Sequence, residues 1–200
     1  GGVGTVGVGR LTHCCEWRGQ LLLFTAGGAL AVDMATGRQY RPDSLQIAGA
    51  VACPGSSPGW QTVANGSGDV LTLRSDGLAS RFNLLPGGRN PSQGGVKIRV
   101  AAAGRALYIA TNGNGLFCLD PARGAMPSRV EEPAGTDALS DMLLCIMATG
   151  DGTLLVGNEA AGVTCVMPGR QTQARYILPE PGDMGSLANT VRHIATRGDG

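Results

Sequence analysis

Short apolar runs alternate with glycine turns along most of this chain. In the clearest example, the apolar run 107–110 leads through Asn-Gly-Asn-Gly to a second apolar run, 116–119, and then to an Asp-Pro-Ala-Arg-Gly turn at 120–124. Runs this short, bounded by glycine and without a 3.6-residue period, are typical of β-strands rather than helices. We therefore predict a protein built of strands and tight turns.

The same pattern recurs with a period of about 38 to 48 residues. Residues identical to Leu107, Gly115, Cys118 and Pro121 stand 47 positions later, at Leu154, Gly162, Cys165 and Pro168. An Asp-x-Ala-x-Gly turn at 33–37 also returns at 120–124. A period in this range, with four short strands in each repeat, indicates an all-β fold of the β-propeller type. Because each blade packs on both faces, its strands should be almost continuously apolar.

The repeat divides the chain into four predicted blades and one extra strand. The predicted boundaries are 1–45 for a first blade with an irregular N-terminal end, 46–90 for a degenerate second blade, 91–138 for the third, 139–186 for the fourth, and 187–200 for the first strand of a fifth. In the second blade, 70–73 and 78–82 resemble the pair of strands at 107–119. The glycine turn at 198–200 should open onto a further strand, so we expect an incomplete ring. Such a fragment would have an unpaired edge and would tend to aggregate.

Composition narrows the classes of function. The 33 glycines, 11 prolines and 16% charged residues argue against long exposed helices, and 42% apolar residues suffice for a core. A net charge of +1 without a basic run gives no reason to expect nucleic acid as a partner. No apolar stretch approaches the roughly 20 residues that span a bilayer. The six cysteines show no Cys-x-x-Cys pair or Cys/His spacing, so we read them as small apolar residues of strands and expect no metal. We expect no cofactor either.

No catalytic constellation is apparent. His13 and His193 are the only histidines, and His193 falls one repeat after Cys145, at an ordinary strand position. The Asp-Gly pairs at Asp76, Asp151 and Asp199 are read as turns in which Asp bonds its own backbone, with calcium or general-acid sites as the alternative. We predict no enzymatic activity for this segment.

A ligand is expected at one face of the disc. There the turns between second and third strands open together with the long loops between blades, and function is common on such loops. Amides and carboxylates can bond sugar hydroxyls, although turns use the same residues. The predicted ligand-binding residues are Asn112, Asn114, Asp137, Asn158, Glu159 and Asp183.

Several of these motifs together resemble the two-component regulator propeller repeat. The match lies in the Gly150-Asp151-Gly152 turn with the strand after it, the Leu-Ala-Asn start at 187–189 and the Asp-Pro turn at 120–121. It covers about 91–200 well, 10–45 partly and 46–90 poorly. Tyr108 and Leu155 replace the usual tryptophan of the second strand, and Asn158 replaces a threonine.

The resemblance implies a periplasmic or otherwise extracytoplasmic sensor of a hybrid histidine kinase that responds to carbohydrate. Its expected partners are a small-molecule or oligosaccharide ligand, the remaining blades and signalling domains of the same chain, and a second copy in a homodimer. The alternative is part of a propeller enzyme of the lyase or quinone-dependent dehydrogenase type, which would need acid/base or metal ligands around a central channel. A WD-type scaffold would need Gly-His and Trp-Asp signatures, which the repeats lack.

Overall fold

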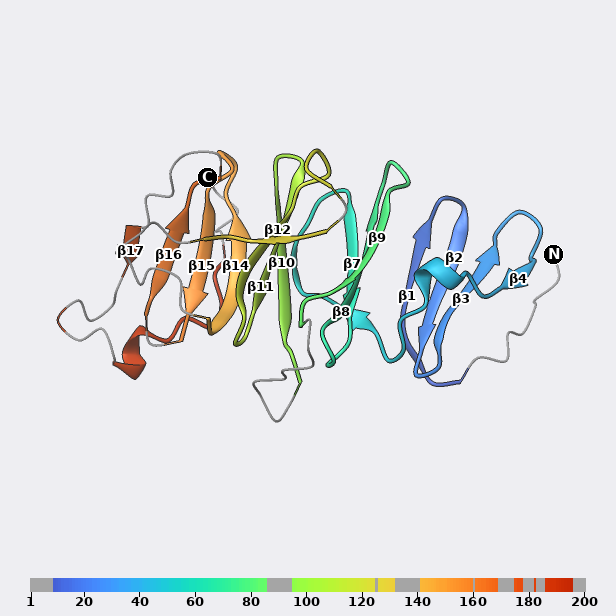
Figure 1. Ribbon diagram of the computed structural model, residues 1–200, viewed down its shortest axis with the longest axis horizontal. Coiled ribbons are helices and arrows are strands. Elements are labelled where there is room, and N and C mark those ends of the chain that lie inside the picture. Colours follow the sequence, from blue (N-terminus) through green and yellow to red (C-terminus); the bar gives the residue numbers. More distant parts are fainter. Residues whose placement is uncertain are drawn as a thin grey trace. The chain divides into compact units, whose positions relative to one another are not determined.

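The computed structural model describes residues 9–85, 95–124, 126–131, 141–159, 161–168, 175–177, 182 and 186–195, and these form four β-sheets (Figure 1). The first sheet has the order β1 (Leu11–Trp17), β2 (Gln20–Thr25), β3 (Gly28–Asp33), β4 (Gln39–Tyr40). The second has the order β5 (Val51–Ala52), β7 (Trp60–Ala64), β8 (Asp69–Arg74), β9 (Ala79–Asn83). The all-β prediction is confirmed.

The third and fourth sheets follow the same up-and-down plan. The third has the order β13 (Ser128–Arg129), β12 (Gly115–Leu119), β11 (Ala106–Thr111), β10 (Ile98–Ala103), β6 (Gly55–Ser56). The fourth has the order β14 (Leu143–Ala148), β15 (Leu154–Asn158), β16 (Val163–Val166), β17 (Arg175–Ile177). Two 3₁₀ helices, Asp43–Leu45 and Leu187–Asn189, are the only helices among the described residues, and neither has the length or apolar character needed to cross a membrane.

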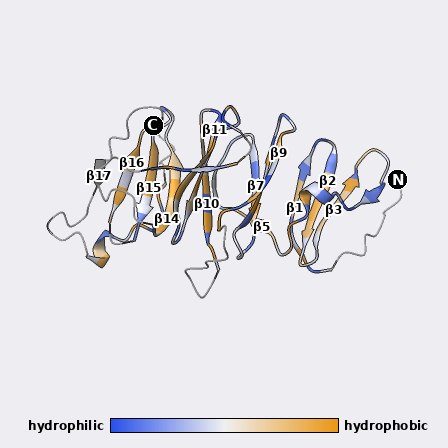
Figure 2. Ribbon diagram, viewed as in Figure 1, coloured by the Kyte–Doolittle hydropathy of each residue, from blue (hydrophilic) through white to orange (hydrophobic). Residues whose placement is uncertain are grey.

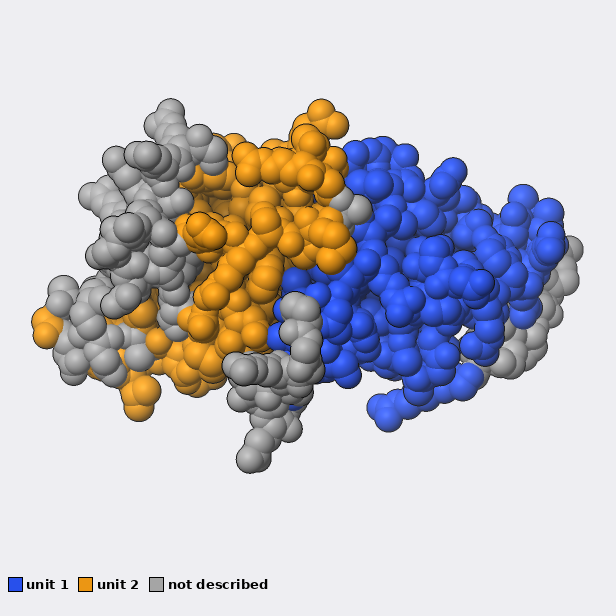
Figure 3. Space-filling view, viewed as in Figure 1, with its two compact units in different colours: residues 1–53, 59–95 blue, residues 54–58, 96–200 orange. Residues whose placement is uncertain are grey.

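The sheets belong to two compact units (Figure 3). One consists of residues 1–53 and 59–95 and holds the first and second sheets, and the other consists of residues 54–58 and 96–200 and holds the third and fourth. Apolar residues concentrate in the strands of both units (Figure 2). The strands β2 and β11 are buried along most of their length, as expected of strands covered on both faces, whereas β9 and β16 alternate buried with more exposed residues.

Each unit has its own core. In the first unit, Leu22 and Phe24 of β2 pack in one cluster with Leu71 and Leu73 of β8, and all four are almost completely buried. In the second unit, Tyr108 of β11 and Val156 of β15 belong to one cluster. Full burial of one such side chain stabilises a fold by about 1.5–3 kcal/mol. These clusters explain why the apolar runs recur along the chain.

The recurring Asp-x-Ala-x-Gly motif is a hydrogen-bonded turn in the structure. Asp33 Oδ1 accepts hydrogen bonds from the backbone N–H groups of Ala35 and Thr36, at 3.0 and 2.8 Å. Asp120 Oδ1 accepts the equivalent bond from Ala122 at 2.9 Å. Aspartate recurs because it can satisfy backbone donors within its own turn.

The strand order of the second sheet differs from the prediction. The run 70–73 lies in β8, which is the third strand from the β5 edge of the sheet rather than the second. The glycine turn that corresponds to 112–115 is therefore 65–68, where Asn65, Gly66 and Gly68 stand 47 positions before Asn112, Gly113 and Gly115. Residues 74–77 resemble a glycine turn, so 70–73 and 78–82 were predicted as second and third strands. They are the third and fourth strands of the sheet.

Residues 54–58 also depart from the predicted blade boundaries. Although they fall inside the range 46–90, β6 pairs in parallel with β10 of the third sheet, with Gly55 opposite Val100. Gly55 has φ +144°, and a Cβ added to it would lie 1.7 Å from the carbonyl oxygen of Val100. Only glycine permits this close approach of the two backbones. A parallel pairing of two residues is too short to produce an apolar period in the sequence, so the sequence did not predict it.

The predicted first strand of a fifth blade is absent from the described part of 187–200. Residues 187–189 form a 3₁₀ helix, and 190–195 have no strand structure. This segment instead caps the fourth sheet, because Gly162 N–H donates to the carbonyl of Asn189 at 2.7 Å and Val191 N–H donates to that of Asn158 at 3.1 Å.

Candidate functional site

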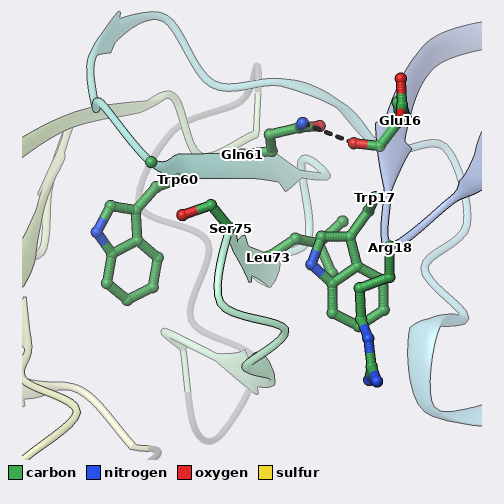
Figure 4. A pocket seen from close by; sticks show the side chains of 8 residues that line it. Glu16, Trp17, Arg18, Trp60, Gln61, Leu73 and Ser75 are labelled. Carbon is green, nitrogen blue, oxygen red and sulfur yellow. Dashed lines mark hydrogen bonds between the residues drawn. The ribbon is translucent and has the colours of Figure 1, made fainter.

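The only two tryptophans of the chain line one pocket in the first unit (Figure 4). The pocket has a volume of about 450 Å³. Its lining residues are Glu16, Trp17, Arg18, Gly59, Trp60, Gln61, Leu73 and Ser75. Ligand pockets commonly combine aromatic side chains with a few polar groups in this way.

Strand register brings the tryptophans to this pocket. Trp17 is the last residue of β1, directly before the two-residue turn Arg18-Gly19, and it pairs with Gln20. Trp60 is the first residue of β7 and pairs with Arg74, the last residue of β8. Both rings therefore stand where their sheets end in a turn.

Side-chain hydrogen bonds tie the two sheets of this unit together at the pocket. Gln61 Nε2 donates to the carbonyl of Glu16 at 2.8 Å, as Figure 4 shows. Trp17 Nε1 donates to the carbonyl of Arg74 at 2.9 Å. Each bond joins the first sheet to the second, so the pocket wall is made from both.

Arg74 also orients the second tryptophan. Its guanidinium carbon lies 5.5 Å from the centroid of the Trp60 ring, within the range of a cation–π contact. Its Nη2 forms an ion pair with Asp76, and this bond holds the pKa of the Asp76 carboxyl down at about 2. Arg74 thus contacts both indoles, one through its backbone and one through its side chain.

The pocket presents a defined set of chemical groups. The indole rings of Trp17 and Trp60 lie on either side of Ser75 and Leu73 (Figure 4). Trp17 is half-buried, while Trp60 is 8% exposed. Aromatic surface beside amide and hydroxyl groups can bind a ligand that has both apolar faces and hydroxyls.

Two predicted ligand-binding residues, Asn112 and Asn114, lie together in the turn between β11 and β12. Asn112 is buried and its Oδ1 accepts a hydrogen bond of 2.6 Å from the backbone N–H of Lys97. Asn114 Nδ2 is a buried atom without a partner among the described residues. The Asn112 amide thus bonds the backbone that leads into β10, whereas Asn114 Nδ2 has no partner among the described residues.

Two others, Asn158 and Glu159, lie at the corresponding turn of the fourth sheet. Asn158 is fully buried, and its Nδ2 donates to Thr164 Oγ1 at 3.0 Å and to the carbonyl of Val156 at 3.1 Å. Glu159 is exposed. Both turns reach Met142, which forms a β-bridge with Asn112 and accepts a hydrogen bond from Glu159 N–H at 3.1 Å.

The remaining two predicted residues, Asp137 and Asp183, lie outside the described residues. A role in ligand binding for any of the six stays a prediction. Asp76 and Asp151, by contrast, are turn residues as predicted. Asp76 Oδ1 accepts from Leu78 N–H at 3.2 Å, and Asp151 Oδ1 accepts from Thr153 N–H at 3.1 Å.

The tryptophan pocket was missed by sequence reasoning. One signal was present: Trp17 and Trp60 are 43 positions apart, within the period of the repeat. The two residues are not equivalent in their sheets, since one ends a first strand and the other begins a second. In each sheet, however, the tryptophan lies beside the connection between the first and second strands. A spacing of about one repeat therefore places both residues at the same end of neighbouring sheets.

The second unit has a separate pocket of about 550 Å³. Tyr108 and Cys118 lie in its wall, and burial raises the pKa values of both. Two arginines of its rim are already engaged, because Arg123 Nε is 3.5 Å from Asp120 and Arg129 bonds Asp141. No cluster of His, Cys, Asp and Glu suited to a metal ion occurs in the described parts of either unit.

No family model and no curated protein matches this sequence. Solved structures do match. PorZ, an essential surface component of the type-IX secretion system of Porphyromonas gingivalis, is 16% identical, with a TM-score of 0.55 over 90% of this chain and 24% of PorZ. At this identity the likeness bears on the fold alone, which is of the β-propeller type.

Two other matches are more distant. BamB from Moraxella catarrhalis is 13% identical, with a TM-score of 0.46 over 88% of this chain and 52% of BamB. The extracellular domain of the hybrid two-component system BT4673 from B. thetaiotaomicron is also 13% identical, with a TM-score of 0.46 over 86% of this chain and 22% of that domain. The chain spans about a quarter of PorZ and about half of BamB.

Proposed function

We propose that this chain is a ligand-binding β-propeller module, the extracytoplasmic sensor part of a hybrid histidine kinase that responds to carbohydrate. One observation carries the proposal: both tryptophans of the chain meet in one pocket that also offers amide and hydroxyl groups. The proposal assigns binding rather than catalysis to residues 1–200.

The pocket chemistry favours a saccharide over a purely apolar ligand. The C–H face of a pyranose ring can stack on an indole, which is large, rigid and loses little conformational entropy on binding. Gln61 keeps its Oε1 acceptor in addition to the Nε2 bond to Glu16, and Ser75 is exposed at the wall. These groups can bond sugar hydroxyls around the stacked ring.

The signalling role is supported by the resemblance of residues 91–200 to the two-component regulator propeller repeat. The Asp-Pro turn at 120–121 forms the bonded turn described above, and the turn at 150–152 is closed by Gly152 N–H bonding the carbonyl of Thr149 at 3.0 Å. A kinase domain and further blades of the same chain, and a homodimer partner, belong to this proposal.

Intrinsic fluorescence provides a direct test because both fluorophores line the pocket. The full-length protein would be titrated with neutral and acidic oligosaccharides, and emission and binding heat would be followed together. We expect a saturable emission change with one saccharide class, and at least tenfold weaker binding for Trp17→Phe. A smaller loss is expected for Trp60→Phe, because this ring is 8% exposed and lies beneath the Arg74 guanidinium. Tyr40→Phe, a conservative change at a 37%-exposed aromatic of the same unit outside the pocket, is the control.

Two results would contradict the proposal. If no saccharide produced a saturable signal, sensing of carbohydrate at this pocket would be excluded. If saccharide bound but left autophosphorylation of the full-length protein unchanged, the module would bind sugar without the proposed signalling role.

A further inference from the structure

The geometry points to Arg18 as a residue that selects a carboxylate, so that the tryptophan pocket prefers an acidic saccharide such as an oligouronate. This inference rests on the proposed function, because it names the class of saccharide that the same pocket binds. It comes from the backbone of Arg18, from the position of its side chain, and from the charges around the two indoles.

Arg18 has an unfavourable backbone conformation. Its φ is +53°, and it is the only non-glycine residue with positive φ in the described ranges. With Gly19 at φ +72° it forms a two-residue turn of the type that favours Asn-Gly. An ordinary side chain in this conformation costs roughly 1–2 kcal/mol. The turn itself demands positive φ, so the unusual feature is an arginine at a position where Asn or Gly is less strained, and this suggests a function for the side chain.

The Arg18 side chain is held along the wall of the pocket. Its guanidinium carbon lies 5.6 Å from the Trp17 ring centroid. On the other side is Gly77, where an added Cβ would lie only 3.3 Å from Arg18 Cδ and Nε. Glycine at 77, with φ +97°, leaves the space that this arrangement needs. The guanidinium is thus partly preorganised beside the indole.

Arg18 supplies the unpaired positive charge of the pocket. Within the described part of the chain it forms no ion pair, whereas Arg74 is engaged by Asp76 and by the Trp60 ring. The Glu16 carboxylate points away from the two indoles in Figure 4, and only its backbone carbonyl bonds Gln61. A negative ligand group near Trp17 therefore meets Arg18 first.

A uronate suits this arrangement. Its pyranose ring can stack on an indole while the carboxylate at C5 accepts two parallel bonds from a guanidinium. Arginine is well suited to this role because its planar fork matches a carboxylate and is weakly hydrated. A charge-assisted pair of this kind should raise affinity by about tenfold or more.

A matched ligand pair tests the inference. Oligogalacturonate and its methyl ester have the same rings and linkages and differ in charge, and the full-length protein would be titrated with each by calorimetry. We expect the acid to bind at least about tenfold more tightly and to weaken as NaCl is raised, because the charge is partly exposed. The ester should be insensitive to salt.

Variants then locate the selectivity. Arg18→Gly removes the charge and suits the positive φ, so the turn should stay folded and the preference for acid should disappear. Arg18→Lys should retain part of the preference, and Arg123→Gly, at an arginine in the second unit with an 85%-exposed side chain, should retain all of it.

Equal binding of acid and ester by the wild type would overturn the inference and leave carbohydrate sensing intact. A preference that survives Arg18→Gly would overturn the role of Arg18, and binding of neither ligand nor any neutral saccharide would count against the proposed function itself.

Discussion

The indole N–H of Trp17 bonds the backbone carbonyl of Arg74, which lies 57 positions later in the chain and in a different sheet. The side chain of the same arginine covers the ring of Trp60. One residue therefore fixes both aromatic walls of the candidate pocket. Stability and binding should respond together when this link is changed.

Trp17→Phe tests the link directly, because it keeps an aromatic ring but removes the N–H donor. We expect a loss of about 1–2 kcal/mol in the free energy of unfolding, since the partly buried Arg74 carbonyl loses its partner. Urea denaturation at constant pH measures it. An unchanged midpoint would mean that solvent replaces the bond at no cost.

Gly77→Ala should disturb the position of Arg18. The new Cβ has to occupy φ +97° and to displace Arg18 Cδ. Gly37→Ala is the matched control, since Gly37 has φ +71° and open space around its Cα. Both variants should lose roughly 1–2 kcal/mol of stability from the left-handed backbone. Only Gly77→Ala should also weaken acidic saccharide binding, and equal affinities for the two variants would contradict the contact.

The ion pair of Arg74 and Asp76 should make the folded state less stable at acid pH. The folded-state pKa of Asp76 is about 2, below the value of about 3.9 expected for an unfolded chain, so the pair is fully formed above about pH 4. Its contribution to stability should disappear as the pH falls from about 4 to about 2. A carboxyl NMR titration of Asp76 measures the midpoint. Asp76→Asn should have a flatter stability profile over that interval, and a midpoint near 4 would contradict the pairing.

Asn158 and Glu159, adjacent in the chain, should behave differently. Asn158→Ala removes a fully buried amide that donates to Thr164 and Val156, so we expect a loss of about 2 kcal/mol in unfolding free energy. Glu159→Gln changes an exposed side chain and should stay within roughly 0.5 kcal/mol of the wild type. Thermal melts and saccharide titrations of both separate stability from binding. Weaker binding by Glu159→Gln at unchanged stability would favour a ligand site at this turn.

The sequence determined the strands and turns of the fold because these depend on neighbouring residues. Apolar runs bounded by glycine predicted strands at 107–110 and 116–119, and the observed strands are Ala106–Thr111 and Gly115–Leu119. The Asp turns at 33–37 and 120–124 close through bonds within a few residues. Such local bonds leave a repeating signal that one sequence suffices to detect.

Tertiary structure alone decided the pocket and the exceptions to the repeat. Trp17 and Trp60 line one pocket because side-chain hydrogen bonds join their two sheets. The parallel pairing of Gly55 with Val100 joins segments 45 positions apart. Arg18 likewise lies over the Trp17 ring and beside Gly77, which is 59 positions later in the chain. These relations depend on how sheets pack and on which side chains fit between them, and the pattern of apolar and polar positions contains no record of either.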